Sequence, residues 1–254
     1  MLESTFIHIP GVGATTEQRL WESGIRTWRD ALDRRDKPLH FSADRWQVVQ
    51  DTLADSSRSL KARDHAYFAR LLASRDHWRA FPDFRHSVAY LDIETTGCSG
   101  CDMVTVIGLY DGKRTRQYVA GDNIADFPED IARYSLLVTF NGATFDLPFI
   151  KRCFGGLEFD QLHVDLRYPL AHLGHKGGLK FIERKLGIQR ESGVVGLDGW
   201  DAVRLWNEYR RGNSDSLATL LDYNRADIEN LAILMDLAYT QLWARVATGE
   251  GAPE

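Results

Sequence analysis

The 254-residue sequence contains few cysteines and no long apolar segment. Three cysteines, Cys98, Cys101 and Cys153, are too few for a disulfide framework and fit a reducing compartment. No apolar run approaches the roughly 18 residues of a membrane span. The first residues lack the basic start and the apolar stretch of a signal peptide. These absences predict a cytoplasmic protein without a membrane partner.

Cys98 and Cys101 form a Cys-x-x-Cys pair. A structural zinc site usually takes four ligands from two such pairs, and the sequence has no second pair. A redox-active pair would open a helix, whereas this one interrupts two strand-like runs. We therefore interpret the pair as a turn.

The sequence also lacks an excess of positive charge, since its formal net charge is −5 at pH 7. Proteins that coat nucleic acid non-specifically bind mainly through Lys and Arg, so this charge argues against that class. A site that recruits cations needs acidic ligands and is acidic until they bind. With 44% hydrophobic and 26% charged residues, the composition is that of a soluble globular protein. The length allows one well-cored domain and a smaller one.

Residues 1–35 contain a turn signal followed by two short helical patterns. Gly11 and Gly13 follow a proline, a helix start comes next, and Gly24 separates two apolar repeats of helical spacing. Such a segment resembles the helix-hairpin-helix module, in which backbone N–H groups hold a nucleic-acid phosphate. Gly11 and Gly13 are therefore candidate phosphate-binding residues. A helical cap that packs on the main domain is the alternative.

Residues 36–84 are predicted to be a helical linker. Within them, residues 43–79 indicate two amphipathic helices that are split near residues 55–57. The second carries the basic residues Arg58, Lys61, Arg63, Arg70, Arg75 and Arg79. Such a face is usually solvated, although it could guide a nucleic-acid strand.

Residues 85–246 predict a mixed sheet flanked by helices. Three strand-like runs joined by tight turns indicate an antiparallel meander, and later strands alternate with helices. The expected strands are residues 87–94, 104–110, 115–120, 136–140 and 162–166, and from residue 179 the chain is mainly helical. Antiparallel strands followed by helix–strand alternation predict an α/β fold.

Two carboxylates stand on the first of these strands. Asp92 and Glu94 alternate with Ile93, so they point to the same face. Two such carboxylates repel each other unless a cation lies between them. Their hard oxygen atoms suit Mg²⁺ or Mn²⁺.

Two further acidic positions close later motifs. Asp146 follows the fourth strand and could simply cap a helix. Tyr223 and Asp227 are four residues apart, which sets the phenol and the carboxylate on one helix face. Taken singly, Tyr223 is more often a core aromatic and Asp227 a solvated acid.

Together, the motifs Asp-x-Glu, Asn-x-x-x-Phe-Asp and Tyr-x-x-x-Asp resemble the DEDDy branch of the 3′→5′ exonuclease superfamily, which includes the proofreading domains of family B DNA polymerases. The histidine branch would put His five residues before the last Asp, where this chain has Asp222. Longer stretches are similar to the bacterial YprB-like ribonuclease H-like family: residues 90–97, 138–142, 163–170 and 223–231.

The resemblance implies a ribonuclease H-like fold and a 3′→5′ exonuclease that hydrolyses single-stranded DNA or RNA from a free 3′ end. Two divalent cations, Mg²⁺ or Mn²⁺, would be held by the acids Asp92, Glu94, Asp146 and Asp227. Tyr223 would orient the attacking water, because a phenol is a poor base at neutral pH. The nucleotide would contact Thr95, Thr96, Gly97, Asn141 and Phe145.

Two other functions remain open on the same fold. One is a nucleic-acid-binding protein with little activity alone, and the other is a structure-specific endonuclease. Asp165 could be a fifth ligand but matches none of the four acid positions.

Residues 167–178 are predicted to form a basic loop that either touches phosphates or caps the helix starting at Leu179. Neither the choice between DNA and RNA nor a protein partner follows from the sequence.

Overall fold

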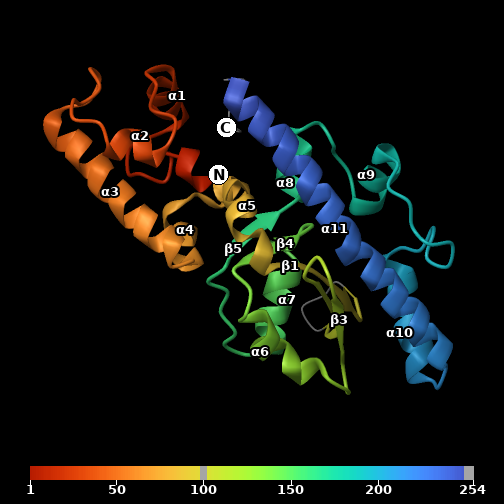
Figure 1. Cartoon of the computed structure of the whole chain (residues 1–254). Coiled ribbons are helices and arrows are strands. Elements are labelled where there is room, and N and C mark those ends of the chain that lie inside the picture. Colours follow the sequence, from red (N-terminus) through yellow and green to blue (C-terminus); the bar gives the residue numbers. More distant parts are fainter. Residues whose placement is uncertain (98–101, 249–254) are drawn as a thin grey trace. The chain divides into compact units, whose positions relative to one another are not determined.

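The computed structural model describes residues 1–97 and 102–248, which form two compact units (Figure 1). The first unit contains Met1–His86, Asp160–His163 and the chain from Tyr239, and the second contains Ser87–Phe159 and Val164–Ala238. Cys98 and Cys101 lie outside the described residues, as does the turn predicted for them. Among the described helices, none is long and apolar enough to cross a membrane.

The first unit is helical. Its core includes Trp28, which stacks on Phe68 with ring centroids 6.1 Å apart and donates its indole N–H to the carbonyl of Thr5. Its α-helices are α1 (Ala14–Glu22), α2 (Trp28–Leu32), α3 (Ala43–Lys61), α4 (His65–Leu71) and α5 (Phe81–Phe84). Three 3-10 turns, Leu2–Ser4, Ser74–Ala80 and Arg85–Ser87, complete the segment.

The predicted glycine turn precedes α1. Gly11 has a φ of +72°, a left-handed conformation that glycine adopts without strain, and Gly13 is the N-cap of α1. Ahead of this turn the chain forms only the 3-10 turn Leu2–Ser4, so both α-helices of residues 1–35 follow the turn. The phosphate-binding role of Gly11 and Gly13 stays a prediction, as does the division at residues 35 and 84.

Helix α3 continues through residues 55–57, where a break was expected. Ser56 and Ser57 each donate a hydroxyl hydrogen bond of 2.8 Å to the carbonyl four residues earlier, so both serines fit within the helix. The break occurs instead at Arg63, which has a left-handed φ of +56°, and Asp64 caps the next helix.

Arg79 is buried, although the sequence suggested that it lies on a basic face. Its side chain is 1% exposed and donates a 2.9 Å hydrogen bond to Glu17, while Asp76 lies 3.5 Å away. Glu17 also accepts hydrogen bonds from the backbone N–H groups of Phe6 and Ile7. The prediction was wrong for Arg79, because its charge is used to hold the N-terminal segment.

The second unit is built on a mixed sheet with strand order β3-β2-β1-β4-β5. The pairs β1–β2 and β2–β3 are antiparallel, and β1–β4 is parallel. The strands are β1 (Val88–Thr95), β2 (Val104–Tyr110), β3 (Thr115–Val119), β4 (Leu136–Thr139) and β5 (Leu162–Asp165). This confirms the predicted ribonuclease H-like α/β fold, with a meander plus parallel pairing.

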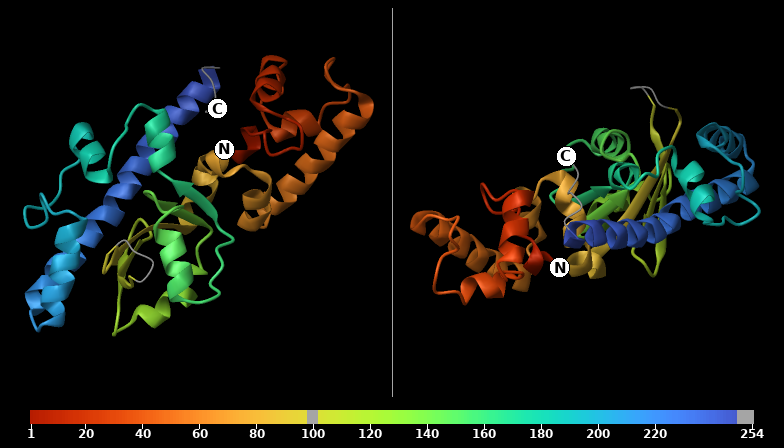
Figure 2. Two further views of the ribbon diagram at one scale, coloured as in Figure 1. Left: turned by 180° about the vertical axis from the view of Figure 1, so that it is seen from behind. Right: turned by 90° about the horizontal axis from the view of Figure 1, so that it is seen from above.

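Helices cover both faces of the sheet (Figure 2). Helices α6 (Phe127–Ile131) and α7 (Asp146–Cys153) pack on one face, and α10 (Gly199–Arg210) and α11 (Ser214–Thr248) on the other. The chain also forms α8 (Arg167–His172), α9 (Leu179–Leu186) and a 3-10 turn at Ile124–Asp126. Helix α8 occupies the first half of residues 167–178, which were predicted to form a loop. That correction limits any loop to the residues between α8 and α9.

The alternation of β1 decides what each face contains. Leu91 and Ile93 pack in one core with Ile150 of α7. Glu94 pairs with Val106, which belongs to the opposite core together with residues of α10 and α11. Since side chains on a strand alternate, Asp92 and Glu94 face the side covered by α10 and α11.

Candidate active site

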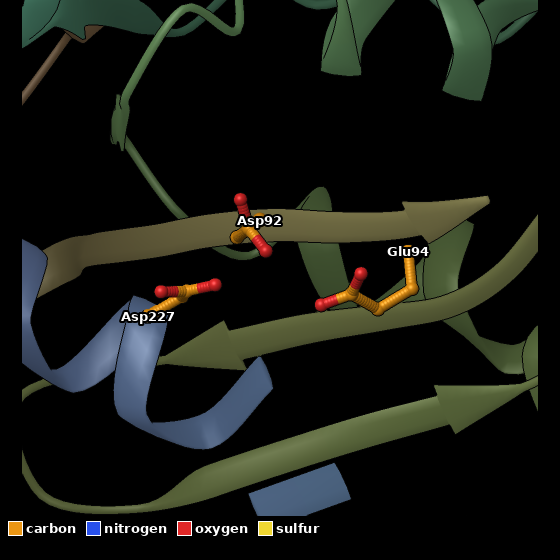
Figure 3. A group of neighbouring side chains, drawn as sticks. All are labelled: Asp92, Glu94 and Asp227. Carbon is orange, nitrogen blue, oxygen red and sulfur yellow. The ribbon is translucent and has the colours of Figure 1, made fainter. Parts of the chain in front are cut away.

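Three acidic side chains from two distant segments converge on this face (Figure 3). Asp92 and Glu94 project from β1, and Asp227 projects from α11. One carboxylate oxygen of each lies within 4.8 Å of the others. The strand motif and the last helix motif of the sequence therefore meet at one site.

Burial makes this concentration of charge unfavourable. It is the main cause that raises the pKa of Asp92 and of Glu94 well above the ordinary value, and the Asp227 carboxylate is the next cause for both. Glu94 Oε1 is buried and has no hydrogen-bond partner among the described residues. A buried acceptor without a partner normally lowers the free energy of unfolding by about 1–3 kcal/mol. Clustered hard oxygens, of which those of Asp92 and Glu94 have no ion-pair partner among the described residues, fit a divalent cation.

Asp146 lies beside this group but outside the 4.8 Å set. Its carboxylate accepts a 3.2 Å hydrogen bond from the backbone N–H of Ile93, the residue between the two β1 acids. Phe145 is the N-cap of α7, and Asp146 is its first residue, so the structure does not bear out a simple capping role. Burial raises the pKa of Asp146 to about 7.

Two cations approach Asp227. Lys180 Nζ lies 3.3 Å from Asp227 Oδ2 and 4.3 Å from the centre of the Tyr223 ring. Arg190 donates two hydrogen bonds to Glu183, of 2.6 and 2.7 Å, and a third to Asp227. Neither cation was predicted from the sequence, because no periodic spacing connects α9 and the segment after it with Asp227.

Asn224 holds the other side of the acid group. Its Nδ2 donates to Asp92 Oδ2 at 3.3 Å, and its Oδ1 accepts from Gln117 at 3.1 Å. Gly108 makes this approach feasible, because a Cβ there would lie 2.1 Å from Asn224 Oδ1. Asn224 was also missed, although its position three residues before Asp227 places it on the same helix face.

Tyr223 is a neutral phenol at this site. Burial, followed by the charges of Asp227 and Glu94, raises its pKa far above the ordinary value near 10. The side chain packs in the core beneath α10 and α11 and also lines the cavity beside the acids. It can therefore donate a hydrogen bond, but it cannot serve as a base at neutral pH.

A cavity of about 380 Å³ opens over the acids. It gathers most of the predicted site residues of this unit: Asp92, Glu94, Thr95, Gly97, Phe145, Tyr223 and Asp227. Six further lining residues were not predicted: Ile93, Lys180, Asp198, Gly199, Trp200 and Val203. Asp146, Thr96 and Asn141 do not line it, and Gly11 and Gly13 belong to the other unit.

The predicted contact residues outside the cavity have partners in the fold. Thr96 donates its hydroxyl to Asp102 at 2.9 Å. Asn141 has a left-handed φ of +69°, and its backbone N–H donates to Asp165 at 2.7 Å. Asp165 also accepts from the N–H of Ala143, so this carboxylate fixes the turn after β4 and lies outside the acid group.

Comparison with known proteins gives a family for the second unit. Residues 89–239 match the sequence model described as the RNase_H superfamily. A family B DNA polymerase from the hyperthermophilic archaeon Pyrobaculum calidifontis is similar in structure, with 18% sequence identity and a TM-score of 0.44. The similarity covers 61% of this chain and 24% of the polymerase. No curated protein matches the chain.

Proposed function

Because the chain belongs to the RNase H superfamily, we propose that it is a nuclease, and specifically a metal-dependent 3′→5′ exonuclease of the DEDDy type. One observation carries this proposal: three carboxylates lie within 4.8 Å of one another, and a buried oxygen of Glu94 has no partner among the described residues. A purely structural site would pair such charges. The YprB-like family is the finer assignment that we propose.

The acids would hold two divalent cations, Mg²⁺ or Mn²⁺. Asp92, Glu94 and Asp227 are the proposed shared ligands, and Asp146, hydrogen-bonded beside them, would complete the set. When bound, such cations activate water and stabilise the leaving 3′ oxygen. Asn224 would keep Asp92 in its ligating orientation, since it donates to that carboxylate.

The remaining side chains would bind and orient the reactants. Tyr223 keeps its proton and would donate it in a hydrogen bond to the attacking water or the scissile phosphate. Lys180 would add positive charge beside that phosphate, because its ammonium group lines the same cavity. The terminal nucleotide would contact Thr95, Gly97 and Phe145 in the cavity.

Two predicted groups would act outside the cavity. Thr96 and Asn141 would support the contact surface through the turns that they form. Gly11 and Gly13 would hold a backbone phosphate at the start of α1. A free 3′ end of single-stranded DNA or RNA is the proposed substrate.

Cleavage of end-labelled strands tests this proposal. Linear and circular single strands of DNA and RNA are incubated with the full chain in Mn²⁺, Mg²⁺ or EDTA. We expect 5′-labelled linear strands to shorten progressively from the 3′ end with metal and to stay intact in EDTA. Circular strands should resist. Cleavage of circles would replace the exonuclease with an endonuclease, and binding without any cleavage would leave a nucleic-acid-binding protein.

Asp92→Asn and Asp227→Asn remove ligand charge with little change of shape. Asp222→Asn is the matched control, because Asp222 lies on α11 beside Tyr223, with its side chain 48% exposed and paired with Arg225. Activity should be lost in the first two variants and kept in the third. Equal activity in all three would show that the acid group is not the catalytic centre.

A further inference from the structure

Trp200 is exposed at the edge of the acid cavity. Its residue is 75% exposed, and it lines the same 380 Å³ cavity as Asp92, Glu94 and Asp227. Tryptophan side chains usually bury most of their large apolar surface. Trp206, on the same helix, follows that rule: it is 6% exposed and packs 5.4 Å from Tyr209. Helix α10 thus buries one of its two tryptophans and exposes the other, Trp200, at the edge of the cavity.

The first turn of α10 holds Trp200 in place. Asp198 accepts hydrogen bonds from the backbone N–H groups of Trp200 and Asp201, at 2.8 and 3.1 Å. In return, Asp201 accepts from the N–H of Asp198 at 3.1 Å, which completes a capping box. The next turns of α10 are anchored in the core through Leu205 and Trp206. The indole thus extends from a fixed backbone, which lowers the entropy cost of binding a ligand.

Trp200 differs from the other aromatic residues that line the cavity among the described residues. Phe145 packs against Phe149 with ring centroids 4.7 Å apart. Tyr223 is 2% exposed and has Lys180 over its ring. Trp200 is the one of the three whose residue is mostly open to solvent, so its ring can receive a planar partner.

We propose that the indole of Trp200 is a stacking platform for a nucleobase of the strand whose 3′ end enters the acid cavity. This inference rests on the proposed nuclease function and adds a specificity-determining residue. Every base has a π face, so stacking tolerates all sequences. Inside a duplex both faces of a base are covered by the neighbouring base pairs, so the platform favours the unstacked bases of a single-stranded end.

The test measures binding and base dependence together, without cleavage. A 5′-labelled single strand is titrated with the full chain in EDTA or Ca²⁺, and intact strand is verified on a gel. The probes are an all-thymidine strand and strands with one abasic site at each of the last four positions. The variants are Trp200→Ala, Trp200→Phe and, as a control, Ile233→Ala, which removes an exposed apolar side chain from α11 outside the cavity.

Loss of the indole should weaken binding about 5- to 100-fold, the effect of one lost base stack. Trp200→Phe should restore most of this affinity, and Ile233→Ala should bind like the wild type. An abasic site at one particular position should weaken wild-type binding by a similar factor and weaken Trp200→Ala little further. Such non-additivity identifies the base that stacks on the indole.

Tryptophan fluorescence gives a second reading that does not require Trp200→Ala to fold. Strand binding should quench the wild-type emission more than the emission of Trp200→Phe. The platform would be overturned if the affinity losses from Trp200→Ala and from the abasic site were additive, or if strand binding quenched the wild type and Trp200→Phe equally. Wild-type affinity in a folded Trp200→Ala would also overturn it and would leave the indole for a protein partner. Undetectable binding by the wild type would overturn it too. Cleavage in Mn²⁺ is scored separately, so a protein that cuts but shows additive losses refutes only the platform.

Discussion

Both units of the molecule bury carboxylates beside cations, but only in the first unit does each carboxylate of the cluster have a cation beside it. In the first unit, Arg79 lies between Glu17 and Asp76, at 2.9 and 3.5 Å. In the second, Asp92 and Glu94 face a third acid, and one Glu94 oxygen has no partner among the described residues. Lys180 and Arg190 lie beside Asp227, whereas Asp92 and Glu94 have no ion pair among the described residues, so the two clusters differ in whether every carboxylate is paired.

This difference separates a structural cluster from a functional one. A buried carboxylate is tolerated when a cation and hydrogen bonds offset its desolvation. Glu17 meets that condition, because it also accepts two backbone hydrogen bonds. The β1 acids meet it only in part, through Asn224 and the cations on Asp227. The unpaired acids lower the stability of the second unit, as expected for a site that takes up cations from solution.

The largest expected effect is on activity. Asp92→Asn, Glu94→Gln and Asp227→Asn should each lower cleavage at least about 10³-fold, because each removes a proposed metal ligand that supports several kcal/mol of transition-state stabilisation. Asp92→Asn and Glu94→Gln should also raise the melting temperature in EDTA, since they remove charge repulsion, whereas Asp227→Asn also loses the ion pairs with Arg190 and Lys180. Single-turnover cleavage and calorimetric melting measure the two effects. A variant that loses both activity and stability would mean that the acids only support the fold.

Removal of the cation from the first unit should have the opposite effect on stability. Arg79→Met leaves Glu17 buried without its charge partner, which should lower the free energy of unfolding by about 3–5 kcal/mol. Arg75→Ala is the control, because its ion pair with Asp76 involves an exposed arginine and should contribute at most about 1 kcal/mol. Urea unfolding measures both. Equal losses would remove the distinction between the clusters.

Acidification should change the contributions of His8 and Asp146 to the free energy of unfolding in opposite directions. Burial lowers the pKa of His8 in the first unit to about 4. Between roughly pH 6.5 and pH 4, the unfolded chain binds a proton that the folded chain does not, so stability is full above pH 6.5 and falls as the pH drops. The full loss at this site is roughly 3 kcal/mol.

In the second unit the raised pKa of Asp146, about 7, has the reverse consequence. The folded acid keeps a proton that the unfolded one releases above roughly pH 4, so this stability is present at low pH and is lost as the pH rises toward 7. Melting in EDTA from pH 5 to pH 7 tests both signs. Asp146→Asn should reduce the gain on acidification, to which Asp92 and Glu94 also contribute, and His8→Gln should reduce the loss. If the melting temperature changed with pH equally in the wild type and in both variants, His8 and Asp146 would not be the groups responsible.

The smallest expected effect on activity comes from Arg190, which tests whether the acid group needs an orienting partner. Arg190→Met removes the donor that joins Glu183 to Asp227 and should reduce activity about 10- to 100-fold, as loss of an outer-shell partner does. Arg190→Lys should recover part of that loss, because it restores the charge without the fork. An unchanged affinity for Mn²⁺ in both variants would show that Arg190 does not position Asp227.

The sequence could predict the residues whose geometry is local. Strand alternation puts Asp92 and Glu94 on one face, and helical spacing does the same for Tyr223 and Asp227, whereas the meeting of the two motifs was expected only from the resemblance to the exonuclease superfamily. Lys180 and Trp200 reach the cavity, and Arg190 reaches Asp227, through the packing of α9, the segment after it and α10, which no local period encodes. Arg79 was misplaced for the same reason, because its partner Glu17 is 62 residues away in the chain.

The central claim is that the β1 and α11 acids form a cation site, and calorimetric titration of the metal-free chain with Mn²⁺ tests it most directly. We predict saturable binding that is lost in Asp92→Asn and Asp227→Asn and retained in Asp222→Asn and Arg75→Ala. Bound Mn²⁺ should also raise the melting temperature of the wild type. No binding by the wild type, or equal binding by Asp92→Asn, would contradict the claim.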